Sequence, residues 1–479
     1  MAETGRLYIG GRLRDTGVTR EVVSPATGDV VGRLAWGGAD DARDALVAAR
    51  DAQQMWAAAG GDARAEWMDR LRERVIDAER ELRTAVVAET GKTWGQSEED
   101  YQLLVDSLSF YAAAARDLAP EPLADRAGTH THELRSEPIG VAVAFVAWNF
   151  PLLNIAYKLG PAMAAGAPLV VKPSAKTSLS AAVLGRLCSE VGLPAGVVNL
   201  VWGDDVEIGD ALSSSEIPAL ITLIGSADTA KHVMRVASTS VKRFSFELGG
   251  NAPVIVLPDA DLDRAADIVA TLKFANAGQV CVAPNRVLVH DDVADDLVAR
   301  LVHRAHDVRV GAGGPGAVDM GPLIDEAAAD RVLSLVDDAV SAGARVVAGG
   351  RRLPDAPTNA FVQPTVIVDV EADMRVAAEE IFGPVIGVQR FSDTRDAIDR
   401  ANATTAGLSA FVFGSDASEI ARCVDALQFG EVHVNGVKYA IELPHGGMKQ
   451  SGSSCDCSLR ALDDYLVTKR VSRPVSSPA

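Results

Sequence analysis

Short β-branched runs alternate with helical patterns from Val141 onward, and this alternation limits the fold more than any other feature. The runs VAVAFVA, PLVVKPS, VVNLVWG, ALITLIGS and KRFSFELGG are separated by segments of helical periodicity, such as residues 178–191 and ADTAKHVMRVAS. A second series starts near Leu262, with helices expected at about 262–277, 293–308 and 325–342 and strands near 286–289 and 361–368. Strands joined by helical crossovers form parallel sheets. The sequence therefore predicts an α/β protein with two open parallel-sheet domains.

Composition narrows the class of protein further. No apolar run approaches the roughly 20 residues that span a bilayer, and the N-terminus has no apolar segment typical of a secretion signal, so we expect a soluble, cytoplasmic protein without membrane contact. A net charge of −19 argues against a nucleic-acid partner, because binding phosphates needs a basic face. The five cysteines are scattered and odd in number, which favours a reducing compartment over a disulfide framework.

Residues 40–118 have amphipathic helical patterns and are expected to cover the first sheet.

Two exposed ribbons are expected outside the alternating series. Residues 128–138, GTHTHELRSEP, alternate polar and apolar without a helical period, and LDDYLVTKRV near the C-terminus is also extended in character. Exposed strands of this kind often pair between subunits. We therefore expect them to form a small β-arm that joins protomers.

Cys281, in KFANAGQVCVAPNR, is the candidate for chemistry. A cytosolic cysteine is more often a small buried hydrophobe, and that alternative stays open for the thiol taken alone. A thiol nucleophile also needs a base and an oxyanion donor. Glu247, in FSFELGGN, ends an apolar strand and is suited to act as a general base. Asn149, in AWNFP, directly follows the strand VAVAFVA, where ligands bind in open α/β sheets.

Seven motifs carry a resemblance to a known family. AWNFP, VVKPS, LIGS, FELGGN, FANAGQVC, EIFGPV and PHGGMKQSG occur in the order seen in the aldehyde dehydrogenase superfamily, and the resemblance covers nearly the whole chain. It implies two Rossmann-like domains, a cofactor-binding domain at 1–121 and 140–248 and a catalytic domain at 249–450, with an oligomerisation β-arm at 122–139 and 460–479. A homodimer or homotetramer is expected.

The resemblance implies an oxidoreductase that converts an aldehyde to a carboxylic acid with NAD or NADP. Cys281 would attack the carbonyl to give a thiohemiacetal, whose oxyanion Asn149 and the Cys281 amide would hold. Glu247 would activate the water that hydrolyses the resulting thioester. Release by coenzyme A is the alternative chemistry, and a non-enzymatic relative is the alternative class, although the presence of all three residues speaks against it.

The cofactor residues carry over one by one. The resemblance assigns them to Trp148, Lys172, Ser174, Lys176, Gly225, Ser226, Leu248, Glu380 and Phe382, and it also places Lys172 with the catalytic set. Many relatives have a glutamate after Lys-Pro-Ser, but this chain has Ala175 followed by Lys176. Losing that carboxylate and gaining a positive charge makes NADP plausible beside NAD.

The tail PHGGMKQSGSSCDCSLRALDDYLVTK is similar to that of the aminobutyraldehyde and betaine aldehyde branch. This similarity favours an amino or otherwise ω-substituted aldehyde, whereas the apolar residues beside Cys281 would also suit a general aliphatic or aromatic aldehyde. The substrate residues expected are Glu99, Phe150, Leu153, Tyr157, Val280, Val282 and Asp456. No metal site is expected, since Cys455 and Cys457 lack a second ligand pair nearby in sequence.

Overall fold

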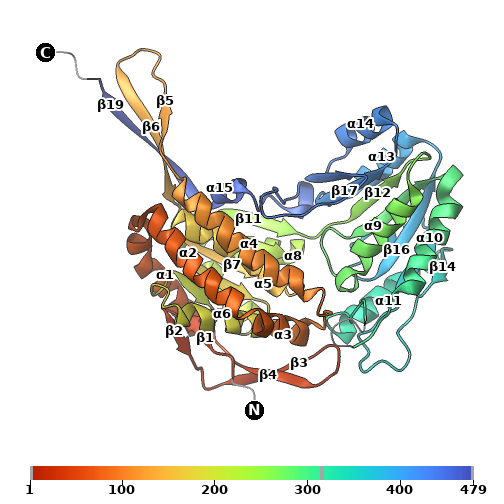
Figure 1. The fold of residues 1–479 in the computed structure, drawn as a ribbon, viewed down its shortest axis with the longest axis horizontal. Coiled ribbons are helices and arrows are strands. Elements are labelled where there is room, and N and C mark those ends of the chain that lie inside the picture. Colours follow the sequence, from red (N-terminus) through yellow and green to blue (C-terminus); the bar gives the residue numbers. More distant parts are fainter. Residues whose placement is uncertain (1–3, 313–317, 476–479) are drawn as a thin grey trace.

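The computed structural model describes residues 4–312 and 318–475. Within these residues the chain forms two seven-stranded sheets, one three-stranded sheet and one two-stranded sheet. The two large sheets lie in separate lobes, and the three-stranded sheet projects from the first lobe (Figure 1). The predicted α/β class with two parallel-sheet units is confirmed. Three of the predicted domain ranges include residues 1–3, 313–317 and 476–479, which lie outside the described residues.

The first large sheet has the strand order β11-β10-β7-β8-β9-β1-β2. Its strands are β1 (Leu7–Ile9), β2 (Arg12–Arg14), β7 (Val141–Val146), β8 (Leu169–Pro173), β9 (Val198–Leu200), β10 (Pro218–Gly225) and β11 (Arg243–Leu248). The five strands from β7 to β11 are parallel, whereas β1 and β2 add an antiparallel edge. Every residue of β7 is buried, as expected for a parallel strand with helices on both faces.

Helices cover both faces of this sheet. They are α1 (Ala39–Ala58), α2 (Gly60–Asp77), α3 (Glu79–Thr90), α4 (Ser97–Arg116), α5 (Pro151–Ala165), α6 (Leu179–Glu190), α7 (Asp205–Ser214) and α8 (Ala227–Val236). Helices α5 and α6 contact the sheet directly, and α2, α3 and α4 pack over them (Figure 1). Helix α1 contacts the sheet together with α7 and α8. The expected helical cover from residues 40–118 is therefore present.

The second large sheet has the order β14-β15-β16-β13-β12-β17-β18. Its strands are β12 (Ala252–Val256), β13 (Pro284–His290), β14 (Arg345–Ala348), β15 (Thr365–Val368), β16 (Val385–Phe391), β17 (Ser409–Phe413) and β18 (Glu431–Val434). All pairings are parallel except that of β14 with β15. The helices of this lobe are α9 (Leu262–Phe274), α10 (Ala294–Asp307), α11 (Glu326–Ser341), α12 (Arg375–Ala378), α13 (Thr394–Asn402) and α14 (Ala417–Ala426).

The projecting arm is the three-stranded sheet β19-β6-β5. It combines β5 (Glu121–Leu123), β6 (His130–Pro138) and β19 (Leu466–Pro474), with β19 antiparallel to β6 along the whole of both strands. The short α15 (Leu462–Tyr465) leads into β19. A separate ribbon of β3 (Thr19–Val23) and β4 (Val30–Ala35) lies near the N-terminus (Figure 1). Both extended segments expected from the sequence are thus strands of one sheet.

One predicted helix ends earlier than expected, and the difference matters for the site. Helix α9 was expected to reach about residue 277, but it ends at Phe274 because Asn276 (φ 47°) and Ala277 (φ 53°) are left-handed. Gly278 follows with φ 75°, and a Cβ there would lie 2.2 Å from the carbonyl oxygen of Gly383. Left-handed backbone of non-glycine residues is costly and clusters at functional sites. The turn carries the chain from α9 to the loop of Cys281.

The described helices contain none that is long and apolar enough to cross a membrane.

Candidate active site

A cavity of about 290 Å³ lies where the carboxyl ends of β7, β10 and β11 meet the loop between α9 and β13. Parallel strands end at the same edge of a sheet, and ligands bind at that edge in open α/β folds. The predicted site residues that line the cavity are Glu99, Trp148, Asn149, Phe150, Leu153, Tyr157, Gly225, Ser226, Glu247, Leu248, Val280, Cys281, Val282, Glu380 and Phe382. Residues distant in sequence are therefore brought to one chamber.

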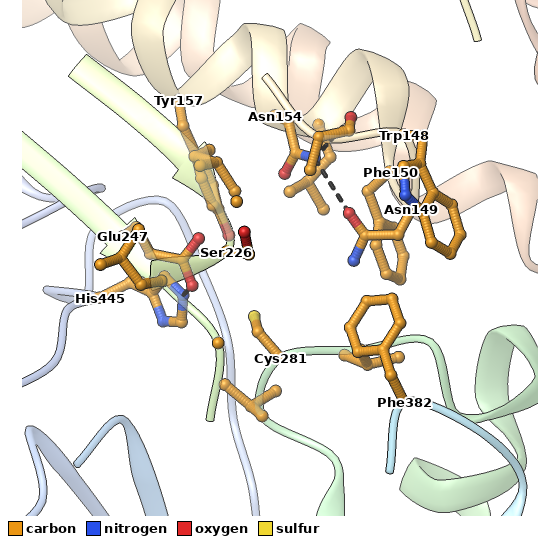
Figure 2. A pocket seen from close by; sticks show the side chains of 18 of the residues that line it. Trp148, Asn149, Phe150, Asn154, Tyr157, Ser226, Glu247, Cys281, Phe382 and His445 are labelled. Atoms are coloured by element: carbon orange, nitrogen blue, oxygen red, sulfur yellow. Dashed lines mark hydrogen bonds and ion pairs between the residues drawn. The ribbon is translucent and has the colours of Figure 1, made fainter. Parts of the chain in front are cut away.

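Cys281 extends into this chamber from the loop after the left-handed turn (Figure 2). Its side chain is partly accessible and forms no disulfide. Burial, followed by the negative charge of Glu247, raises the pKa of the Cys281 thiol, and contact with His445 acts in the opposite direction. A neighbouring group must therefore stabilise the thiolate if this sulfur is to react near neutral pH.

Asn149 is held by hydrogen bonds on both sides of its amide. Its Nδ2 donates to the carbonyl oxygen of Gln279 (3.1 Å), and its Oδ1 accepts from Nδ2 of Asn154 (3.3 Å, dashed in Figure 2). The carbonyl oxygen of Asn149 accepts from Nδ2 of Asn276 (3.0 Å). An amide nitrogen carries two hydrogens, so one N–H of Asn149 remains for an oxyanion in the cavity.

Glu247 is the second-to-last residue of β11 and is buried at the opposite wall of the cavity from Asn149 (Figure 2). Its Oε1 accepts no hydrogen bond from the described residues. Such an oxygen is costly to bury unless a water or substrate proton satisfies it. Gly452 sits across the backbone from Glu247 in an antiparallel bridge, and both Ser453 and Ser454 donate through their backbone N–H to the carbonyl oxygen of Phe246 (3.0 Å each). The strand end that carries Glu247 is therefore clamped by the 452–454 segment.

The sequence analysis missed His445, which lines the same cavity and lies beside Glu247 (Figure 2). Its Nε2 is 3.7 Å from Glu247 Oε1, and its Nδ1 is 2.6 Å from Oε1 of Glu431. The available signal was a titratable residue between the proline and the paired glycines of PHGGMKQSG. Asn154 and Tyr439, which also line the cavity, were missed as well, because both lie outside the seven motifs.

The other half of the cavity has features that fit a dinucleotide. The rings of Trp148 and Phe382 meet edge to face at 5.5 Å, and Glu380 accepts a hydrogen bond from the backbone N–H of Gly250 (3.1 Å). Ser226 caps α8, accepting from the N–H of Thr229, so the first N–H groups of this helix face the cavity wall. Helix N-termini favour anions such as a diphosphate. Burial raises the pKa of Glu380 to about 7.

Lys172, Ser174 and Lys176 do not line this cavity. The Lys172 ammonium, at the end of β8, is bound by the carboxylate of Asp205, which also accepts from the N–H of Ala175 (3.2 Å). Lys176 Nζ pairs with Asp325 (2.5 Å) and lies 5.8 Å from the centre of the Trp148 ring. The positive charge expected to favour NADP is thus neutralised by Asp325, and a second carboxylate, Asp205, lies close by.

Asp456 was expected to contact substrate, and the structure corrects this. Its carboxylate is buried away from the cavity and receives two hydrogen bonds from Lys158 Nζ (2.6 and 2.7 Å). Its backbone pairs with that of His445 in both directions (2.7 and 2.6 Å). Because a buried carboxylate must be paired, Asp456 supports the His445 loop instead of facing a ligand.

One trio among the described residues could hold a metal ion. A sulfur of Cys281, a ring nitrogen of His445 and a carboxylate oxygen of Glu247 all lie within 4.8 Å of one another. These are also the groups with the chemistry of nucleophile and base, so we interpret the trio as a reactive cluster. The sequence expectation of no metal site stays a prediction.

Comparisons with known proteins identify the class. The model of the aldehyde dehydrogenase family matches residues 13–471. The chain is 37% identical over 462 residues to a 3-sulfolactaldehyde dehydrogenase of Pseudomonas putida, which covers 95% of this chain and 94% of the relative. It is 38% identical over 470 residues to a mitochondrial succinate-semialdehyde dehydrogenase of Arabidopsis thaliana, which covers 97% of this chain and 88% of the relative.

Solved structures match as well. The structure of Staphylococcus aureus betaine aldehyde dehydrogenase with NAD+ matches with a TM-score of 0.94 at 31% identity and covers 98% of this chain and 94% of that chain. An NADP-dependent enzyme of Escherichia coli matches with a TM-score of 0.96 at 34% identity (98% of each chain).

The chain belongs to the aldehyde dehydrogenase family. It is an enzyme that oxidises aldehydes, as the order of its motifs predicted.

The clamp on β11 gives a test of how the strand end holds Glu247. Gly452 has φ 109°, and a Cβ there would lie 1.9 Å from the carbonyl oxygen of Phe246, whereas Gly343 has φ 111° with nothing within 4 Å of its Cβ position. We expect Gly452→Ala and Gly343→Ala each to lose about 1–3 kcal/mol of stability from backbone strain. Only Gly452→Ala should also lose turnover, because it displaces Glu247. Thermal unfolding and kcat of both variants measure this, and equal kcat values would contradict the clamp.

Proposed function

We propose that Cys281 is the nucleophile, Glu247 the general base for water and Asn149 the oxyanion-hole amide of this aldehyde dehydrogenase. The observation that supports this most strongly is their convergence on one cavity from three separate segments of the chain. The Cys281 sulfur bonds to the aldehyde carbon, and the oxygen takes up charge beside the free N–H of Asn149. Donors fixed before the reaction stabilise such charge without reorganisation.

Glu247 acts in the second half of the reaction. Its Oε1, which accepts no hydrogen bond from the described residues, is available to take a proton from water, which then attacks the Cys281 thioester. The acid leaves, and the sulfur regains its proton. A buried base of this kind favours hydrolysis over release by coenzyme A, which brings its own nucleophile.

NAD+ or NADP+ supplies the hydride acceptor when it is bound. Trp148, Phe382, Leu248 and Glu380 would hold the nicotinamide end, and Gly225 and Ser226 would present the α8 N-terminus to the diphosphate. Lys172, Ser174 and Lys176 would serve the adenosine end. Because Asp205 and Asp325 occupy the two lysines, a 2′-phosphate would meet carboxylates there, and this favours NAD+ over NADP+.

The substrate proposed is an amino or otherwise ω-substituted aldehyde without a negative charge. The lining of the cavity includes the carboxylates of Glu99, Glu247 and Glu380, and no Lys or Arg side chain among the described residues lines it. Arg286, the nearest arginine along the chain, donates to the carbonyl oxygens of Asn251 and Ala401 (2.9 and 2.8 Å) and is not free for a ligand. The sulfolactaldehyde and succinate-semialdehyde relatives are named for anionic aldehydes, so this chain is proposed to differ from them.

Glu99 and two aromatic rings are part of the cavity lining. Glu99 lies in the first turn of α4 and keeps contact with solvent, while Tyr157 of α5 and Tyr439 line the wall. An ammonium is attracted by both carboxylates and ring faces. Phe150, Leu153, Val280 and Val282 add apolar surface for the carbon chain. A neutral aliphatic or aromatic aldehyde is the second candidate because of this apolar lining.

We propose a domain division based on the two large sheets. Residues 1–121 and 140–248 are proposed as the cofactor-binding domain and 249–450 as the catalytic domain. Residues 122–139 and 460–479 are proposed as an arm that joins protomers into a dimer or tetramer. The exposed strands β6 and β19 support this, because a sheet with free edges away from the body of the protein is suited to pairing.

Replacing the two reacting groups should separate the two halves of the reaction. In Cys281→Ala we expect no aldehyde-dependent formation of reduced cofactor, since no thiohemiacetal can form. In Glu247→Gln we expect one burst of reduced cofactor per site, followed by turnover slowed by about 10²–10⁴-fold, because the general base is lost. Stopped-flow absorbance measures both. Undiminished steady-state turnover of Glu247→Gln would refute its role.

The charge of the cavity mouth should set substrate preference. We expect kcat/KM to rank an aminobutyraldehyde above butyraldehyde and butyraldehyde above succinate semialdehyde. Glu99→Gln should lower kcat/KM for the cationic aldehyde by about two- to fivefold and leave butyraldehyde unchanged, because an exposed carboxylate contributes up to about 1 kcal/mol. Glu98→Gln is the matched control, since Glu98 is adjacent but does not line the cavity. Preference for the anionic aldehyde would overturn the proposal.

Removing β19 should change the assembly. A chain that ends at Tyr465 loses the partner of β6 along its whole length. We expect a smaller species by light scattering, with both large sheets retained in circular dichroism. If the truncated chain forms an assembly of the same number of protomers as the full-length chain, the arm does not join protomers.

A further inference from the structure

His445 lies between the reactive thiol and a carboxylate that the proposed reaction does not use. Its imidazole is buried, with Nδ1 2.6 Å from Oε1 of Glu431 on β18. Its Nε2 lies 3.7 Å from Oε1 of Glu247. A ring nitrogen of His445, the Cys281 sulfur and a carboxylate oxygen of Glu247 all lie within 4.8 Å of one another. Figure 2 shows the ring beside Glu247, near Cys281. A thiol, an imidazole and a carboxylate in this order form the arrangement of an activated nucleophile.

The carboxylate that orients His445 is itself fixed. Glu431 accepts a hydrogen bond from Ser409 Oγ (3.1 Å), and Nε2 of His433 lies 3.4 Å from its Oε2. The His445 backbone is paired with Asp456, whose side chain is anchored by Lys158. The imidazole is therefore held from both its side chain and its backbone, so the nitrogen that faces the sulfur is set by the fold.

The charges around the ring favour a pair of thiolate and imidazolium over a thiol beside a neutral imidazole. Burial alone would lower the pKa of His445, but its contacts with Cys281, Glu247 and Glu431 raise the pKa well above the ordinary value. Burial would raise the pKa of Glu431, yet the two neighbouring histidines lower it to about 2. Burial raises the pKa of Cys281, whereas contact with His445 lowers it. The titratable groups facing His445 are Tyr157, Glu247, Cys281, Glu431, Tyr439, Asp456 and Cys457.

We infer that His445, oriented by Glu431, accepts the proton of Cys281 and stabilises its thiolate. This role depends on Cys281 being the nucleophile, as proposed above. The S–H bond breaks and the proton moves to Nε2 of His445, while the sulfur electron pair forms the bond to the aldehyde carbon. When water cleaves the thioester, the S–C bond breaks and the proton returns from Nε2 to the sulfur. Glu247 takes the proton of the water, so the two half-reactions use different bases.

Glu247 alone is a poorer partner for the thiol. A thiolate beside a carboxylate places two negative charges together in a cavity with few polar contacts, and this disfavours ionisation of the sulfur. An imidazolium beside them offsets one of these charges, and Glu431 holds the imidazolium from its Nδ1 side. Oε1 of Glu247 lies 3.7 Å from Nε2 of His445 and accepts no hydrogen bond from the described residues, so it is left for water.

Alkylation of the full-length enzyme tests this directly. The probe is iodoacetamide, and the label on the Cys281 peptide is quantified by mass spectrometry across about pH 6 to 9, the range in which a His-paired thiol titrates. In His445→Gln we expect the apparent pKa of Cys281 labelling to rise by at least about one unit and the rate near neutral pH to fall about tenfold. Glu431→Gln should move both in the same direction by less. His303→Gln, which changes an exposed histidine on α10, is the control and should match the wild type.

The outcomes are distinguishable. If His445→Gln labels Cys281 with the wild-type rate and pH profile, the role of His445 is wrong, whatever its turnover. If His445→Gln does not fold, as judged by circular dichroism, the Glu431→Gln profile decides, and an unchanged profile there overturns the inference. Retained turnover in Cys281→Ala would instead refute the nucleophile, and with it the proposed function.

Discussion

Two hydrogen bonds between Asn149 and the turn before the nucleophile join the two lobes at the reactive centre. Asn149 lies just after β7, and Asn276 and Gln279 belong to the turn that follows α9. Each side donates one bond to a carbonyl oxygen of the other. The oxyanion donor and the thiol therefore keep a fixed relation although 132 residues of numbering (281 − 149) separate them. The left-handed turn at 276–278 is the backbone conformation that makes this contact.

The cavity concentrates groups that burial would normally neutralise. Glu247, Glu380 and Cys281 all line it, and His445 is the cationic partner at the thiol end. Lys158 and Asp456 form a buried ion pair behind His445, so charge pairing continues into the supporting layer. Such pairs add little stability compared with apolar packing, but removing one partner is costly. Their position behind the reactive cluster is consistent with a structural role in orienting it.

Much of this arrangement was predictable from the sequence, for physical reasons. Strand and helix alternation predicted two parallel sheets, and parallel strands bring Asn149 and Glu247 to one edge. The end of α9 was not predictable from helical periodicity, because Asn276 and Ala277 adopt positive φ only under tertiary contact. Asp456 was misread because a carboxylate in a motif gives no sign of its buried partner Lys158. His445 was missed because only the fold brings its ring beside Glu247 and Cys281, which lie far from it in sequence.

The central claim is that Cys281 carries the substrate as a thioester until Glu247 delivers water. It is tested most directly by acid-quenching Glu247→Gln with an aldehyde and oxidised cofactor, followed by peptide mass spectrometry. The account predicts an added acyl mass on the peptide of Cys281, present only when oxidised cofactor is included. Absence of the adduct during a burst of reduced cofactor, or its appearance on another residue, would contradict it.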